Sequence, residues 1–230
     1  LPIFAVRRLT GYLPGEPALY DYLSGEENLR FSLYVRGCPE HLKRGFTLAE
    51  RLGVDLRPKL RSLSHGQRQK VAIVVALAHD PAVLILDEPT TGLDPLAQEV
   101  FFGLLREEQA AGKTIFMSSH ILPEVEALCG RVGIIRDGYL VEVNEVEALR
   151  RNRFKRVTAV FKDTPPDLSR WPGVSELTVD GERVRFAYQG QILPLLKFLA
   201  EQDLVDLTMN DPSLEEVFRA FYRNGGERGR

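Results

Sequence analysis

The chain has 230 residues, of which 44% are hydrophobic and 27% are charged, and its formal net charge is −2. This length and composition allow a sizeable core in one large domain or two small ones, and the charge balance shows no basic excess of the kind that marks a nucleic-acid-binding protein. No apolar run approaches the roughly 20 residues that a membrane-spanning helix needs. The two cysteines, Cys38 and Cys129, show no metal-binding spacing and indicate free thiols in a reducing compartment.

The first third of the chain is predicted to contain one strand and a small group of helices. Residues 8–13 are predicted to form a short strand, which the Pro-Gly pair after them ends. Ser24 is predicted to begin a helix, because a glutamate three residues later gives the spacing of a capping box, and Thr47 caps a second helix with the same spacing. We therefore expect a helical subdomain over about residues 16–62.

A longer apolar segment follows, in which a buried helix leads to a buried strand. Ser64 is predicted to cap a helix over residues 65–78, whose later positions are mostly apolar and therefore buried. Residues 82–86 are continuously apolar, which predicts a strand covered on both faces within a parallel sheet.

A second helix and a second apolar strand come next. Asp94 is predicted to cap the helix, with proline at its first position, and residues 114–117 form the strand. A strand, a helix and a strand at this spacing imply a right-handed parallel crossover. The carboxyl ends of the two strands then open on one sheet edge, where ligands bind in open α/β sheets. Asp87 and Glu88 follow the first strand, and His120 follows the second.

The remainder of the chain is predicted to form a hairpin and a separate α+β domain. Residues 132–143 fit a hairpin that turns at an Asp-Gly pair. The domain boundaries that we expect are 1–149 for the first domain, 150–156 for a basic linker, 157–223 for the α+β domain and 224–230 for a flexible tail. A charge run such as this linker is usually solvated, and the alternative is a contact with acidic lipid headgroups or with a partner.

The sequence LSHGQ, at Leu63 to Gln67, is a candidate anion site. A hydroxyl cap and a glycine at the start of a helix leave backbone N–H groups available to an anion. The alternative is an ordinary capped helix, which these five residues alone would favour.

The acidic pair after the first apolar strand is a candidate for phosphoryl-transfer chemistry. Such chemistry needs one carboxylate near Mg²⁺, here Asp87, bound directly or through water, and one group that orients or deprotonates a water molecule, here Glu88. A solvated acidic turn is the alternative, but it does not explain the unbroken apolar strand before the pair. His120 ends the neighbouring strand and can reach the same phosphate, although a histidine there is more often an ordinary surface residue.

The order and spacing of these motifs resemble the nucleotide-binding subunits of ATP-binding cassette (ABC) transporters. The matching positions are Leu63–Gln67 for the signature motif, with His65 where glycine is usual, Asp87 and Glu88 for the Walker B aspartate and catalytic glutamate, Thr91–Asp94 for the D-loop and His120 for the switch histidine. The helical segment and the C-terminal unit are similar to subunits of the drug- and antibiotic-exporter branch. The resemblance implies the α/β fold of P-loop NTPases (RecA-like), with a helical subdomain and a small C-terminal α+β domain.

In that family, two nucleotide-binding domains enclose ATP and Mg²⁺ between them. The resemblance therefore implies catalytic roles for Glu88 and His120, and magnesium binding by Asp87. It also implies a second nucleotide-binding domain and transmembrane permease subunits as partners, no nucleic-acid partner, and a cytoplasmic location at the inner face of the cell membrane. The positions expected to bind nucleotide are Ser64, His65, Gly66, Gln67, Asp94 and, on weaker grounds, Glu16.

The sequence departs from the family pattern in two ways. It contains no GxxxxGK[ST] phosphate loop (Walker A), and Gly112-Lys113-Thr114 is no substitute, because it follows a predicted helix and precedes a strand. We expect the chain to lack an N-terminal segment that carries this loop, and to be inactive alone. Where the family has a Q-loop glutamine, the sequence has Glu16.

The sequence leaves other functions open. The chain could be a non-catalytic cassette that only provides a scaffold or donates its signature surface, or a non-transport ABC ATPase that acts on DNA or ribosomes. The absence of heptad arms and of a basic stripe argues against the last of these. Tyr20 and Tyr22 are expected either to face a permease or to pack within the helical subdomain.

Overall fold

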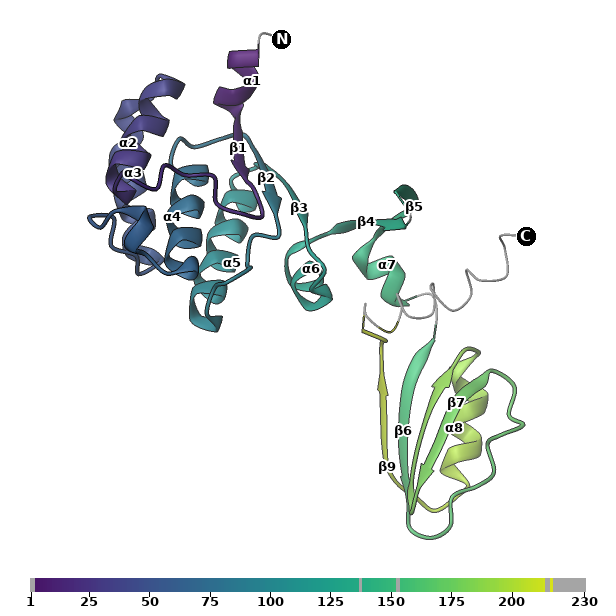
Figure 1. Ribbon diagram of the computed structural model, residues 1–230. Helices are drawn as coiled ribbons and strands as arrows, with labels where there is room; N and C mark the ends of the chain where they lie inside the picture. Colours follow the sequence, from purple (N-terminus) through teal and green to yellow (C-terminus); the bar gives the residue numbers. More distant parts are fainter. Residues whose placement is uncertain (1–2, 137, 152–153, 214–215, 217–230) are drawn as a thin grey trace. The chain divides into compact units, whose positions relative to one another are not determined.

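A computed structural model describes residues 3–136, 138–151, 154–213 and 216 (Figure 1). The chain divides into two compact units, Leu1–Ile121 and Leu122–Arg230, which are described here one at a time. Among the described residues, no helix has both the length and the apolar character needed to cross a bilayer. The elements of the first unit are α1 (Ile3–Leu9), β1 (Thr10–Leu13), α2 (Gly25–Arg36), η1 (Pro39–His41), α3 (Leu42–Arg51), η2 (Leu60–Ser62), α4 (His65–Leu77), β2 (Val83–Asp87), α5 (Pro95–Ala110) and β3 (Thr114–Ser118).

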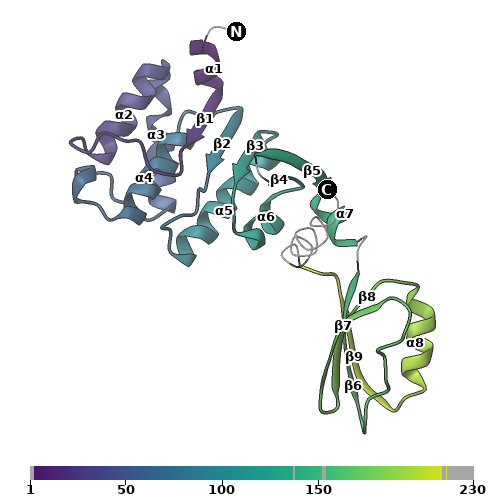
Figure 2. The ribbon, with the colours of Figure 1, turned by 45° about the vertical axis from the view of Figure 1, so that its right-hand side comes forward.

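The centre of the first unit is a three-stranded parallel sheet in the order β1-β2-β3. The predicted parallel pairing of the two strands is confirmed, because β2 and β3 pair in parallel along their whole length, with Asp87 opposite Ser118. Figures 1 and 2 show α4 and α5 on the same side of the strands. The expectation of a strand buried on both faces is wrong for the described structure: Leu84 and Leu86 face inwards and are buried, whereas Ile85 is exposed.

The N-terminal strand is shorter than predicted. Helix α1 extends to Leu9, so that only Thr10–Leu13 forms β1, in parallel pairing with β2. Gly11 is where β1 meets the end of α4: a Cβ at this position would collide with the carbonyl oxygen of Ala76 and with the side chain of Leu84. The close approach of α4 to the strand therefore requires glycine.

The helical subdomain is built from α2 and α3, and only the first of the two predicted starts is confirmed. Ser24 and Glu27 form the expected capping box, in which the Glu27 amide donates to Ser24 Oγ at 3.1 Å and the Ser24 amide donates to Glu27 Oε2 at 2.7 Å. Helix α3 begins at Leu42, and Thr47 lies inside it, donating its hydroxyl to the carbonyl oxygen of Lys43 at 3.2 Å. The predicted cap at Thr47 is therefore wrong.

The elements of the second unit are α6 (Leu122–Leu128), β4 (Arg131–Arg136), β5 (Tyr139–Glu145), α7 (Val146–Arg151), β6 (Lys155–Phe161), β7 (Val174–Asp180), β8 (Arg183–Tyr188), α8 (Ile192–Ala200) and β9 (Leu204–Asn210). Strands β4 and β5 form the predicted antiparallel hairpin, while Asp137 of its turn lies outside the described residues. The last four strands form an antiparallel sheet in the order β7-β8-β6-β9. This sheet and α8 share one core, whose buried members include Phe161, Phe186, Leu195 and Leu199.

The mixed α/β architecture with a parallel sheet confirms the predicted fold class. The domain boundaries remain a prediction. Helix α7 extends to Arg151 and β6 begins at Lys155, so both elements reach into the segment 150–156 that we expected to be a linker. The tail expected over residues 224–230 lies outside the described residues.

Candidate active site

The predicted catalytic residues meet at the carboxyl edge of the parallel sheet. Asp87 ends β2 and Ser118 ends β3 beside it, and the Ser118 hydroxyl donates to Asp87 Oδ1 at 2.5 Å. The same hydroxyl oxygen accepts a hydrogen bond from the Glu88 amide at 3.1 Å. The Ser118 hydroxyl therefore holds the carboxylate of Asp87 and the backbone amide of Glu88.

Glu88 points toward the predicted switch histidine. Its Oε2 lies 2.8 Å from Nδ1 of His120, so the two side chains are hydrogen-bonded. The backbone of Glu88 has φ of +44°, an unfavourable value for a residue with a side chain, which costs on the order of 1–3 kcal/mol. Such strain persists where neighbouring contacts hold the residue, here the hydrogen bonds from its amide to Ser118.

Glu16 lies in the segment after β1, next to the same edge. A Cβ on Gly15 would lie 3.5 Å from Oδ2 of Asp87, so the backbone here passes close to the Asp87 carboxylate. Glu16 itself is exposed. The segment that contains Glu16 therefore passes beside the carboxyl edge of the sheet, and its contact with nucleotide remains a prediction.

The segment predicted as an anion site lies at the start of α4, and its binding of an anion remains a prediction. Ser64 and Gln67 form a capping box, in which the Gln67 amide donates to Ser64 Oγ at 3.3 Å and the Ser64 amide donates to Gln67 Oε1 at 3.0 Å. Because a hydroxyl can both accept and donate, Ser64 can cap the helix and still donate to an anion. His65 is exposed and Gly66 is half-buried at this helix end.

The predicted D-loop connects β2 to α5 and lies against the start of α4. Asp94 caps α5 by accepting from the Ala97 amide at 2.9 Å, and its other carboxylate oxygen lies 3.1 Å from Nζ of Lys70. Both interactions lower the pKa of Asp94, the hydrogen bond from Ala97 most strongly. Gly92 has φ of +78°, which favours glycine.

Three residues of this region were not among the predicted site residues. Ser118 was noted only as a strand end, and its place opposite Asp87 depends on strand register, which a single sequence does not fix. Gln69 and Lys70, on α4, contact the D-loop. Their positions in the second turn of the helix give no signal of these long-range contacts.

The donor set at the sheet edge fits a magnesium ion. Mg²⁺ prefers oxygen ligands and usually binds one or two carboxylates together with substrate phosphates. Asp87 offers the carboxylate, and the Ser118 hydroxyl adds a further oxygen next to it. The described residues contain no cluster of three or more histidine, cysteine or acidic side chains arranged for a metal ion.

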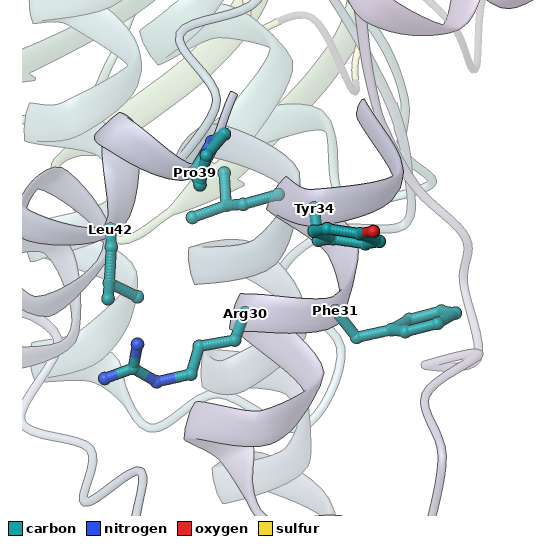
Figure 3. Close-up of a pocket in the computed structure, with 6 residues that line it drawn as sticks. Arg30, Phe31, Tyr34, Pro39 and Leu42 are labelled. Atoms are coloured by element: carbon teal, nitrogen blue, oxygen red, sulfur yellow. The ribbon is translucent and has the colours of Figure 1, made fainter. Parts of the chain in front are cut away.

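A separate pocket of about 420 Å³ lies in the helical subdomain (Figure 3), lined by Arg30, Phe31, Leu33, Tyr34, Pro39 and Leu42. Further aromatic rings lie next to Phe31. The ring centroid of Tyr20 is 5.2 Å from that of Phe31, in an edge-on arrangement, and 5.9 Å from that of Tyr22. The side chains of Tyr20 and Tyr22 are 45% and 65% exposed. Both tyrosines therefore contribute to an exposed aromatic surface rather than to the interior.

Comparisons with known proteins agree with the motifs. The family model described as "AAA domain, putative AbiEii toxin, Type IV TA system" matches residues 55–125. The mouse protein ATP-binding cassette sub-family A member 7 is 32% identical over 97% of this chain, which spans only 11% of that relative. The Bacillus subtilis ABC transporter ATP-binding protein NatA is 36% identical over 64% of this chain and 62% of its own length.

Among solved structures, an ATP-binding subunit of an ABC transporter superposes with a TM-score of 0.62 and 32% identity, over 65% of this chain and 64% of that one. The motifs, the sequence similarity and the fold all indicate the same family. The chain is a homologue of the ATP-binding subunits of ATP-binding cassette transporters.

Proposed function

We propose that this protein is the ATP-hydrolysing subunit of an export-type ABC transporter and works as one of two paired nucleotide-binding domains. The observation that carries the proposal is the hydrogen-bonded pair of Glu88 and His120, 2.8 Å apart, beside Asp87 at the carboxyl edge of a parallel sheet. This arrangement supplies a general base next to a carboxylate suited to magnesium. Hydrolysis of a phosphoanhydride requires this combination.

The chemistry of the site follows from the positions of three side chains. Glu88 accepts a proton from the attacking water, and its hydrogen bond to His120 holds the carboxylate in one orientation. Asp87, oriented by Ser118, would hold Mg²⁺, which neutralises phosphate charge when it is bound. In the resting structure Glu88 is 30% exposed at its side chain, so water can reach it.

The signature segment serves the second nucleotide of the pair. The 13-residue helix α4 directs its positive end and its unpaired amides toward any anion at Ser64. Ser64 and Gly66 donate to the γ-phosphate of ATP held by the partner domain, with His65, Gln67 and Asp94 around it. One chain thus contributes to two ATP sites: water activation in one and phosphate recognition in the other.

The aromatic surface around Tyr20, Tyr22, Phe31 and Tyr34 is proposed to receive a permease subunit. Tyr34 is 78% exposed and Phe31 is 45% exposed, although both are large side chains that proteins usually cover. The adjacent pocket offers a concave apolar seat for a helix end (Figure 3). Binding there would place this protein at the cytoplasmic face of the membrane.

The alternative is a subunit that donates its signature surface but does not catalyse. Two substitutions in the assembled transporter distinguish these functions. If the protein catalyses, Glu88→Gln and Ser64→Ala both lower ATP turnover. If it only donates the signature, Ser64→Ala lowers turnover and Glu88→Gln leaves it unchanged. Unchanged turnover in both variants contradicts both functions.

For the polypeptide of residues 1–230 alone, we expect weak or undetectable binding of Mg-ATP by titration calorimetry. A phosphate loop normally supplies the backbone amides and the lysine that hold the phosphates, and these 230 residues contain no such motif. Tight, stoichiometric binding would contradict this expectation.

A further inference from the structure

The first two turns of α4 and the loop Pro89–Asp94 are joined by three separate side-chain contacts. They come from His65, Gln69 and Lys70, and each reaches a different point of the loop. The loop follows Glu88 directly. The contacts therefore link the signature segment to the residue that activates water.

His65 packs on the backbone of Gly92. A Cβ on Gly92 would lie 2.9 Å from Nε2 of His65 and closer still to its Cδ2, so no other residue fits under the imidazole without movement. Gly66 also approaches this glycine closely, because a Cβ on Gly66 would collide with the carbonyl oxygen of Gly92. His65, which stands where the signature motif usually has glycine, therefore covers the backbone of the loop at Gly92.

Gln69 holds the beginning of the loop from inside the protein. Its side chain is fully buried, and Nε2 donates to the carbonyl oxygen of Pro89 at 2.9 Å. Among the described residues, no group hydrogen-bonds its Oε1. A buried polar atom without a partner costs about 1–3 kcal/mol. An apolar residue would avoid this cost, but it could not donate to the carbonyl oxygen of Pro89. We therefore take this hydrogen bond as the role of the Gln69 side chain.

Lys70 holds the end of the loop. Its ammonium group lies 3.1 Å from Asp94 Oδ2, and its side chain is only 15% exposed. The other oxygen of Asp94, Oδ1, already accepts from the Ala97 amide at 2.9 Å. The carboxylate is therefore fixed at both oxygens.

We propose that His65, Gln69 and Lys70 are positioning residues that hold the loop Pro89–Asp94, and Glu88 before it, in register with the signature serine. The Thr91 amide donates to the carbonyl oxygen of Glu88 at 3.2 Å, so displacement of the loop would displace the base. This role rests on the proposed ATPase function, but the contacts themselves can be tested without nucleotide.

Amide hydrogen exchange of the intact protein without nucleotide tests the contacts directly. The amides of Thr91 and Leu93 report on the loop, because both are hydrogen-bonded within it. We expect His65→Ala and Lys70→Met each to speed their exchange by roughly threefold or more, since loss of one contact favours local opening. Lys70→Arg, which preserves the ion pair, should restore slow exchange.

His41→Ala is the matched control, because His41 lies in the helical subdomain next to α3, away from the loop in sequence, and lies within ion-pair distance of Glu40. It should leave exchange at Thr91 and Leu93 unchanged. Exchange that is equally slow in the wild type, His65→Ala and Lys70→Met would overturn the proposal. So would equal acceleration by the His41→Ala control, because the loop would then respond to general destabilisation.

A kinetic measurement on the assembled transporter separates this proposal from the proposed function. His65→Ala should lower kcat for ATP and leave KM close to the wild-type value, since it shifts the base without removing a phosphate donor. If loop exchange responds as expected but the assembly shows no turnover that depends on Glu88, the proposed ATPase function fails while the positioning contacts stand. A raised KM with unchanged kcat would overturn the positioning role.

Discussion

At the scale of single residues, the site depends on a serine that holds two acids. Ser118 donates to Asp87 and accepts from the Glu88 amide, and these contacts keep Glu88 at a positive φ with its carboxylate toward His120. The identity of the acids could be predicted from the apolar strand before them. The role of Ser118 could not, because it depends on which residue of β3 stands opposite Asp87.

Ser118→Ala is expected to lower ATP turnover of the assembled transporter by about 10–100-fold, as losses of groups that orient ligands usually do. The free energy of unfolding should fall by only about 1 kcal/mol, because the residue is exposed. Steady-state ATPase and urea denaturation measure the two effects. Ser119→Ala, one residue along the chain, is the control and should turn over ATP near the wild-type rate. Equal loss in both variants would contradict a specific role for Ser118.

His79 predicts a pH dependence of stability. It is 5% exposed, and burial, followed by the nearby charge of Arg36, lowers its pKa from 6.5 to about 4. The folded state therefore prefers the neutral ring. The stability associated with His79 is fully present above pH 6.5 and is lost as the pH falls from 6.5 to 4, by at most about 3 kcal/mol.

Urea denaturation of the wild type and of His79→Gln at pH 7, 6 and 5 measures this contribution. Glutamine can still donate to the carbonyl oxygen of Thr10, which lies 3.2 Å from Nε2 of His79, but it does not titrate. The free energy of unfolding of His79→Gln, relative to that of the wild type, should increase as the pH falls. A difference that stays constant with pH would show that His79 is not buried in its neutral form.

At the scale of elements, local chemistry predicted some helix ends and missed others. Ser24 and Ser64 were recognisable because each begins a capping box, which acts within four residues of sequence. The start of α3 was missed because His41 makes no side-chain cap there, and Thr47 bonds back to Lys43 inside the helix. Where a helix begins through packing and a preceding 3-10 turn, the sequence contains no such signal.

The two capping boxes form a matched pair for testing function. Ser24→Ala and Ser64→Ala should each lower the free energy of unfolding by about 1 kcal/mol, the usual cost of a lost cap. Only Ser64→Ala should also lower ATP turnover of the assembled transporter, because only Ser64 faces a phosphate in our proposal. Denaturation and ATPase assays on both variants provide the comparison. If Ser24→Ala lowered turnover as much, the loss would reflect stability and not phosphate contact.

At the scale of the whole molecule, helices α4 and α5 lie on the same side of the parallel sheet of the first unit (Figures 1 and 2). Tyr12, Ile85 and Phe116 stand opposite one another on the three strands, and their side chains are 55%, 38% and 68% exposed. An apolar run predicted a strand covered on both faces, because periodicity cannot show how many layers pack on a sheet. The fold class and the composition of the site were predictable, whereas the burial of each face was not.

This apolar row is expected to bind a hydrophobic dye and to promote self-association of the isolated polypeptide. Phe116→Ser should reduce both, with a change in unfolding free energy within about 0.5 kcal/mol, as is usual for exposed positions. Leu96→Ser is the control, since Leu96 is 71% exposed on α5. Dye fluorescence and light scattering measure the effects. Equal effects of the two substitutions would mean that the row is not a distinct surface.

In our proposal, Glu88 activates water for ATP hydrolysis. The most direct measurement is the steady-state ATP turnover of the assembled transporter with the wild-type protein, Glu88→Gln and Glu99→Gln, the last being an exposed glutamate on α5. Glu88→Gln should lower kcat by about 10²–10⁴-fold, the usual contribution of a general base, while Glu99→Gln keeps the wild-type rate. Wild-type turnover in Glu88→Gln would contradict the claim.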